Sequence, residues 1–222
     1  GATITLAAGA TLDARAAGGL TVATGKTLVG EGNINGGLTM AAGATLRVGG
    51  PAATGTLTVT DGGATVNGAT FMKINAATKT TDALIAQDSI QLGGTLTVDN
   101  LGGRLANGDT FKLFNAPALS GSFSQVTLPL LEPGQIWINK LSTDGTLVVM
   151  DIVLTPKMLP GGFWQFTWDP QLNGRVRLQA QTNALDVGLS DNWVDYPNGD
   201  FNGVLHTPDP NSPSVFFRLR TQ

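Results

Sequence analysis

Short apolar segments alternate with small-residue turns through the first 60 residues. Ala-Ala-Gly-Ala-Thr-Leu at 7–12 recurs unchanged at 41–46 and returns as Ala-Thr-Gly-Lys-Thr-Leu at 23–28. A second phrase, Leu-Thr followed by Val or Met, alternates with the first. The leucines at 12, 20, 28, 38, 46 and 57 are too sparse for one face of an amphipathic helix, but they suit short strands separated by tight turns. The pattern predicts an all-β chain in which residues 1–60 form stacked rungs of a short β-solenoid.

The threonines of these phrases are predicted to lie on the outer surface of the rungs. Neighbouring side chains of a strand point to opposite faces, so each threonine beside an inward leucine or valine faces outward. The β-branched threonine suits such a position. The residues concerned are Thr11, Thr21, Thr39 and Thr58.

From residue 61 to 150 the phrases lengthen and become less regular. Phe111 and Leu113 alternate with Thr110 and Lys112, which is typical of a half-buried strand in an antiparallel sheet. We therefore expect the repeat to end near residue 60. Residues 61–150 are predicted to form a sandwich-like continuation or a cap.

A small separate domain is predicted after residue 161. Pro156 and the run Pro160–Gly162 are breakers, which favours a linker over 151–161. Strand-like alternation follows over 163–168, 174–180, 192–196 and 214–220, and Asn-Gly pairs supply the turns. Three of the four tryptophans fall in 162–222, which predicts a compact aromatic core there.

Several runs carry a resemblance to a known family. They are Thr81–Ile85, Leu92–Val98, Leu105–Phe114, Gly121–Pro129, and Trp137 with Gly145–Val149. With them, residues 1–150 resemble the end of an autotransporter-associated β-strand repeat protein of the kind found in Verrucomicrobia. The resemblance implies an exported, surface-associated β-rich passenger without catalytic residues.

The last 61 residues are similar to a second kind of domain. Asp191-Asn-Trp193 and the terminal Phe-Phe-Arg-Leu-Arg are similar to small fibronectin-III-like domains that end bacterial surface proteins. This resemblance implies an immunoglobulin-like (Ig-like) β-sandwich over 162–222.

Composition excludes several classes of function. The chain of 222 residues is 41% apolar, enough for a substantial core, and its net charge of -3 offers no basic surface for nucleic acid or anionic membranes. Cysteine is absent, which excludes disulfides, thiolate metal sites and cysteine nucleophiles. No apolar run reaches the length of a membrane span, and no cofactor motif is present.

Candidate catalytic residues are few. His206 is the only histidine, and its setting in His-Thr-Pro-Asp-Pro predicts an exposed turn. Glu31 and Glu132 are the only glutamates, and the aspartates before residue 150 mostly flank glycines or strand ends, which favours turn formation over paired acid and base catalysis. The chain is therefore predicted not to be an enzyme.

One stretch has the spacing of a calcium loop. Oxygen-bearing residues and a turn glycine occupy positions 1, 3, 5, 6 and 12 of that pattern: Asn198, Asp200, Asn202, Gly203 and Asp209. Asparagine at position 1 and aspartate at position 12 depart from it. An ordinary hairpin loop is the alternative.

Four arginines flank an acidic stretch that has no lysine or arginine of its own. Arg175 and Arg177 share one strand face, and Arg218 and Arg220 share another. Cross-strand ion pairing with the intervening aspartates is one interpretation. The other is a charged contact with a neighbouring subunit or with an acidic glycan.

Aromatic side chains of the C-terminal domain could stack on sugars. The candidates are Trp164, Trp168, Trp193 and Tyr196. Alternation places Trp164, Phe166 and Trp168 on one face of a strand, which more often indicates a core than a ligand surface.

These observations predict a non-enzymatic, secreted and cell-surface-associated structural protein that assembles into a homo-oligomer or fibre through exposed strand edges. In a more specific version of this assembly hypothesis, the segment of Thr3, Ile4, Thr5 and Leu6 is donated as a strand to a neighbouring chain. The alternative is that this segment is simply the first rung, capped by an upstream portion of a longer chain. A carbohydrate-binding or adhesion module is the competing function.

Overall fold

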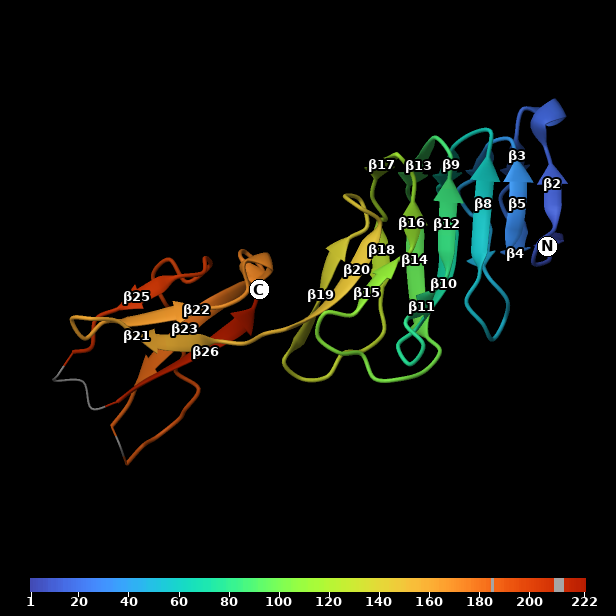
Figure 1. The fold of residues 1–222 in the computed structure, drawn as a ribbon. Coiled ribbons are helices and arrows are strands. Elements are labelled where there is room, and N and C mark those ends of the chain that lie inside the picture. The colour runs from blue at the N-terminus through green and yellow to red at the C-terminus, as the bar shows by residue number, and fades with distance from the viewer. Residues whose placement is uncertain (185, 210–213) are drawn as a thin grey trace. The chain divides into compact units, whose positions relative to one another are not determined.

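The computed structural model describes residues 1–184, 186–209 and 214–222 (Figure 1). Its elements are β-strands, apart from two three-residue 3-10 helices at Arg15–Ala17 and Pro170–Leu172 among the described residues. The chain divides into two compact units, Gly1–Met150 and Asp151–Gln222. The all-β prediction is confirmed.

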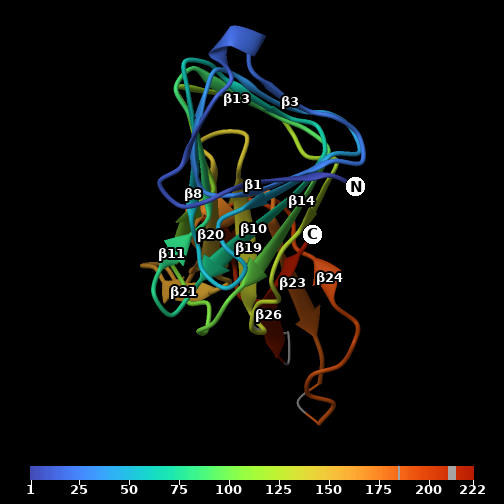
Figure 2. The same cartoon turned by 90° about the vertical axis from the view of Figure 1, so that its right-hand side faces the viewer.

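The first unit is a β-solenoid of about five turns, in which each turn adds one strand to each of three parallel sheets. The first sheet holds β1 (Thr3–Leu6), β4 (Thr27–Gly30), β7 (Thr45–Val48), β10 (Ala69–Asn75), β14 (Thr95–Asn100) and β18 (Gln125–Thr127). The second holds β2 (Thr11–Asp13), β5 (Gly32–Asn35), β8 (Thr56–Thr60), β12 (Ala83–Ala86) and β16 (Phe114–Asn115). The third holds β3 (Leu20–Val22), β6 (Leu38–Met40), β9 (Ala64–Val66), β13 (Ser89–Leu92) and β17 (Ala118–Gly121). Viewed along the solenoid, successive turns lie behind one another (Figure 2).

The repeated phrases stack in register. Leu28 of β4 pairs with Leu46 of β7, and both side chains are buried at 0% and 1% exposure. Thr21 of β3 and Thr39 of β6 also pair, and both are exposed. The phrase therefore recurs because each turn must place a leucine over a leucine and a threonine beside a threonine.

The solenoid does not end at residue 60, where the sequence pattern placed its end. Strand β12 pairs in parallel with β8 and with β16, and β14 pairs in parallel with β10 and with β18. The turns become irregular because residues are added outside the ladder, including the short β11 (Thr80–Thr81), which pairs antiparallel with β10. Alternating burial persists through β10, so stacking survives the insertion.

An antiparallel sheet follows the last turns. It consists of β15 (Thr110–Lys112), β20 (Thr146–Asp151) and β19 (Gln135–Lys140), in that order. Phe111 pairs with Leu147, as the alternation in this segment predicts, and Leu147 and Val149 join the same core as Phe114 of the last turn. Gly145 links the two by accepting backbone hydrogen bonds from Leu113 and Phe114. This sheet caps one end of the solenoid.

The second unit contains two antiparallel sheets of three strands. One has the order β21 (Thr155–Met158), β22 (Trp164–Thr167), β25 (Val204–His206); the other has the order β24 (Val194–Asp195), β23 (Val176–Thr182), β26 (Val215–Thr221). The rings of Phe166 and Phe217, one from each sheet, lie 4.2 Å apart. The predicted strands are confirmed, whereas the finer assignment to an Ig-like sandwich stays a prediction.

The predicted linker over 151–161 is wrong in its extent. Residues 155–158 form β21, which pairs with β22 from Thr155 opposite Thr167 to Met158 opposite Trp164. Proline lacks an N–H to donate and is therefore confined to edge strands, and β21 is an edge strand of its sheet. Pro156 is thus compatible with a strand here, although in the sequence it indicated a break.

Candidate functional site

The first turn of the solenoid has free strand edges. Within the described chain, β1, β2 and β3 each pair on one side only, with β4, β5 and β6. Their apolar residues Ile4, Leu12 and Leu20 pack against the core but stay half-buried, whereas the residues paired with them are fully buried: Leu28, Ile34 and Leu38. This end therefore presents both backbone hydrogen-bonding groups and apolar surface.

The hydrogen bonds of β1 identify which of its groups are free to pair. The carbonyls of Ala2 and Leu6 accept from the N–H groups of Thr27 at 3.2 Å and of Glu31 at 3.0 Å. Backbone groups alternate in direction along a strand, so those of Thr3 and Thr5 face the open edge. The segment Thr3–Leu6 pairs in parallel with β4 of its own chain, and its donation to a neighbour stays a prediction.

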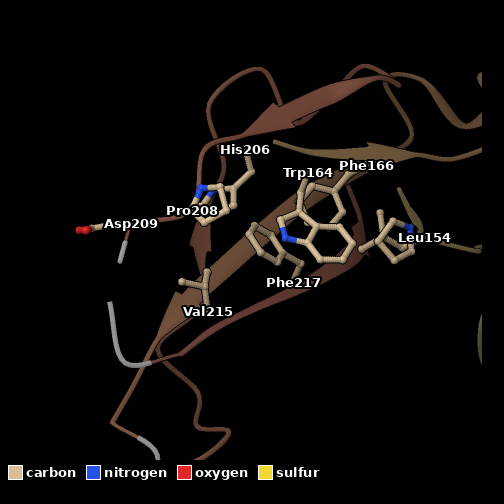
Figure 3. A pocket seen from close by; sticks show the side chains of 9 residues that line it. Leu154, Trp164, Phe166, His206, Pro208, Asp209, Val215 and Phe217 are labelled. Carbon is tan, nitrogen blue, oxygen red and sulfur yellow. The ribbon is translucent and has the colours of Figure 1, made fainter. Parts of the chain in front are cut away.

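The second unit contains an aromatic groove, with a volume of about 640 Å³. Its walls come from β21, β22, β25, β26 and adjoining residues: Leu154, Pro156, Trp164, Phe166, His206, Pro208, Asp209, Val215 and Phe217. Trp164, Phe166 and Phe217 lie together along its floor, with His206 and Pro208 beside them (Figure 3).

His206 is not in an exposed turn, contrary to the sequence prediction. It ends β25 and is half-buried, with its ring centroid 4.9 Å from that of Phe217 and its Nδ1 3.0 Å from the Tyr196 hydroxyl. Burial lowers the pKa of His206 and raises the pKa of Tyr196. The imidazole is therefore neutral near pH 7 and acts as part of the aromatic packing.

The four aromatic candidates do not form one platform. Trp168 is buried and its Nε1 donates to Asn173 Oδ1 at 3.2 Å, while Trp193 lies beneath the Arg218 guanidinium, 4.2 Å from ring centroid to Cζ. Of the four, Trp164 lines the groove, and Tyr196 contacts His206. The prediction of core packing holds for Trp168 and Phe166, both 4% exposed.

Of the four candidate arginines, Arg177 forms ion pairs within the second unit, as one interpretation of the sequence predicts. Arg177 donates from Nε to Asp200 at 2.6 Å and from a terminal nitrogen to Asp195 at 2.7 Å. Hydrogen bonds from Gln179 and Arg177 lower the pKa of Asp195, and the hydrogen bond from Arg177 lowers the pKa of Asp200.

The other three arginines are placed differently. Arg218 donates to Gln179 Oε1 at 3.0 Å, and Arg220 pairs with Arg177 in the strand register. Arg175 is exposed. The four side chains therefore do not converge on one charged site, and ion pairing inside the unit accounts for Arg177.

The residues with the spacing of a calcium loop form turns and hydrogen bonds within the second unit. Asp200 is occupied by Arg177 and by Gln222, whose Nε2 donates at 2.6 Å, and Asn202 Oδ1 accepts from the backbone N–H of Trp168 at 2.9 Å. Asn198 and Gly203 take positive φ angles of 58° and 94° and form turns. In the described ranges, no group of three or more His, Asp or Glu side chains is arranged to hold a metal.

Sequence reasoning missed a buried polar pair, Lys73 and Asp82. Aspartates in this half of the chain were interpreted as turn formers, which is correct for Asp144, whose Oδ1 accepts from the Thr146 N–H at 3.0 Å. Asp82 instead is 0% exposed. No sequence signal marks it, because its partners Gly55 and Lys73 lie 27 and 9 residues away along the chain.

Comparison of the chain with protein-family models, with curated proteins and with solved structures finds no match. Within the described residues, no helix is both long enough and apolar enough to cross a membrane.

Proposed function

We propose that this chain is a non-enzymatic structural protein of the cell exterior, and that two copies pair through the first turns of their solenoids. The observation that carries the proposal is the asymmetry of the solenoid. Its first turn leaves three strand edges free within the described chain, and a sheet covers the other end. Free edges of this kind are templates for pairing with another chain.

The capped end limits the kind of assembly. A fibre built by head-to-tail contacts needs two complementary ends, and the sheet of β15, β20 and β19 occupies one of them. The first turns of two copies can still meet around a two-fold axis that passes through β1, which pairs β1 antiparallel with β1 of the other copy. The proposed assembly is therefore a closed dimer in place of the fibre expected from the sequence.

The extracellular location rests on the family resemblance of residues 1–150. Its test is protease treatment of intact source cells. Degradation of the protein while a cytoplasmic marker survives supports the location, and full protection contradicts it.

Substitution of Thr5 tests the dimer. Because the Thr5 N–H faces the open edge, Thr5→Pro removes an outward donor without removing a bond to β4. Thr5→Ala is the matched control, since it keeps the N–H. Light scattering after size exclusion, over a concentration series, should show a dimer for the parent chain and Thr5→Ala, and a shift to monomer for Thr5→Pro. Monomers at every concentration, or equal dimerisation of both variants, would contradict the proposal.

A second candidate function is carbohydrate binding, favoured by the half-buried Trp164 in the groove of the second unit. Indole faces stack on sugar rings, and clefts of this size hold small ligands. Affinity electrophoresis against soluble polysaccharides should show retardation that Trp164→Ala abolishes. Trp193→Ala is the control, because Trp193 is covered by Arg218 and does not line the groove. Equal retardation of both variants would contradict binding in the groove.

A further inference from the structure

A lysine and an aspartate meet at a corner of the fourth solenoid turn. Lys73 lies near the end of β10, and Asp82 directly precedes β12. The Lys73 Nζ is 2.6 Å from Asp82 Oδ2. The Asp82 side chain is 0% exposed and that of Lys73 is 16% exposed, so the contact is enclosed by protein.

The carboxyl group of Asp82 is held in place by backbone donors. The Gly55 N–H donates to Oδ1 at 2.8 Å and the Lys73 N–H donates to Oδ2 at 2.7 Å. The Lys73 Nζ also donates to the Val48 carbonyl at 2.7 Å, which fixes the nitrogen beside the carboxyl group.

Two glycines make room for this arrangement. A Cβ at Gly49 would lie 2.4 Å from Asp82 Oδ1, and a Cβ at Gly55 would lie 2.1 Å from Glu31 Oε2. The corner therefore has space for the Asp82 carboxyl group only because residue 49 lacks a side chain. The half-buried carboxylate of Glu31 borders the same corner.

The surroundings favour the protonated form of the Asp82 carboxyl group. Burial raises the pKa of Asp82, against the opposing hydrogen bonds from Lys73 and Gly55. Moving the shared proton from Nζ to Oδ2 over 2.6 Å turns a buried ion pair into an amine and a carboxylic acid. The amine and the carboxylic acid are the forms that react to give an amide.

We propose that Lys73 and Asp82 form an intramolecular isopeptide bond. The Nζ lone pair attacks Cγ of the protonated carboxyl group, and the negative charge that develops on Oδ1 is stabilised by the Gly55 N–H. The Cγ–Oδ2 bond then breaks, one proton passes from Nζ to the departing hydroxyl, and one water molecule leaves. Nothing is oxidised or reduced.

The bond ties the end of β10 to the start of β12 and closes the β10–β11 hairpin covalently. It lies within one chain and does not involve the first turn, so it forms whether or not the chain dimerises. A covalent tie at a corner suits a structural protein because it prevents that turn from opening under load.

Intact mass spectrometry of the denatured full chain tests the proposal. The expected mass is lower than the sequence mass by about 18 Da, one water. Trypsin should not cut after Lys73, and the peptide of residues 48–79 should remain joined to that of residues 80–104. A mass equal to the sequence mass, with normal cleavage after Lys73, would overturn the proposal.

Variants separate the bond from general effects on the fold. Lys73→Arg and Asp82→Ala should have their full sequence masses, because each removes one reacting group. Lys79→Arg is the matched control: the Lys79 Nζ lies 2.6 Å from Asp109, the same distance, but its side chain is 55% exposed. Its mass deficit should equal that of the parent chain, and loss of the deficit would overturn the assignment to Lys73.

Discussion

Gly30 controls whether the first strand of the solenoid stays attached. It ends β4 with a φ of 133°, and a Cβ placed on it would lie 1.8 Å from the carbonyl oxygen of Leu6. That oxygen accepts the Glu31 N–H at 3.0 Å and belongs to β1. The substitution Gly30→Ala therefore forces β1 away from β4 and leaves the later turns untouched.

The magnitude follows from what β1 contributes. Strain of an L-residue at positive φ costs about 1–3 kcal/mol. A lost hydrogen bond costs about 1 kcal/mol, and exposure of Leu6, which is 8% exposed in the fold, costs about 1.5–3 kcal/mol. The expected loss of stability in Gly30→Ala is about 3.5–7 kcal/mol, confined to the first turn.

Gly25→Ala is the matched control. Gly25 also has a positive φ, 74°, but a Cβ there would meet nothing within 4 Å. This variant should lose only the strain of about 1–3 kcal/mol. Hydrogen exchange with mass spectrometry should show faster exchange over residues 1–10 and 27–31 in Gly30→Ala than in Gly25→Ala. Equal exchange in these segments would refute the reasoning from close approach.

Three further predictions concern the second unit. The stability of this unit should fall as the pH drops below about 6.5, because burial lowers the pKa of His206 and the unfolded chain binds a proton more readily. Thermal melting at several pH values should show this fall. His206→Gln should make the melting temperature less dependent on pH. Arg177→Lys should lower the urea midpoint slightly, since lysine cannot bridge Asp195 and Asp200 as the guanidinium does, whereas Arg175→Lys should leave it unchanged. Leu178→Ala, at a 0% exposed position, should lower the stability of this unit by about 2–5 kcal/mol and leave the unfolding transition of the solenoid unchanged. A shift of both unfolding transitions in calorimetry would contradict the division into two units.

Sequence reasoning could predict the part of the fold that depends on the local alternation of apolar and polar residues. Stacking of Leu28 over Leu46 and the outward threonines follow directly from phrases that recur at near-regular intervals. The antiparallel strand at Phe111 could likewise be predicted, because alternating burial is a property of consecutive residues. These signals need no knowledge of distant contacts.

The features that were missed depend on partners far along the chain. Pro156 indicates a break when considered alone, and only its place on an edge strand makes it acceptable. His206 is likewise half-buried because Phe217 of β26 and Tyr196, which follows β24, pack against it. Asp82 has no local signal at all, since its donors include Gly55, 27 residues away.

The corners explain why the solenoid continues after its phrases lose their regularity. Where an insertion takes the backbone out of the strand ladder, a backbone N–H loses its partner in the neighbouring strand. A polar side chain accepts a hydrogen bond from that N–H instead. Asp82 accepts from Gly55 after the excursion at 50–54, and Asn100 Oδ1 accepts from the Ala76 N–H at 3.1 Å where β10 ends. Unsatisfied buried N–H groups are costly, so each insertion needs such an acceptor to be tolerated. Turns can therefore vary in length at their corners while the leucines between the corners stay stacked, which is why the solenoid extends beyond its most regular phrases.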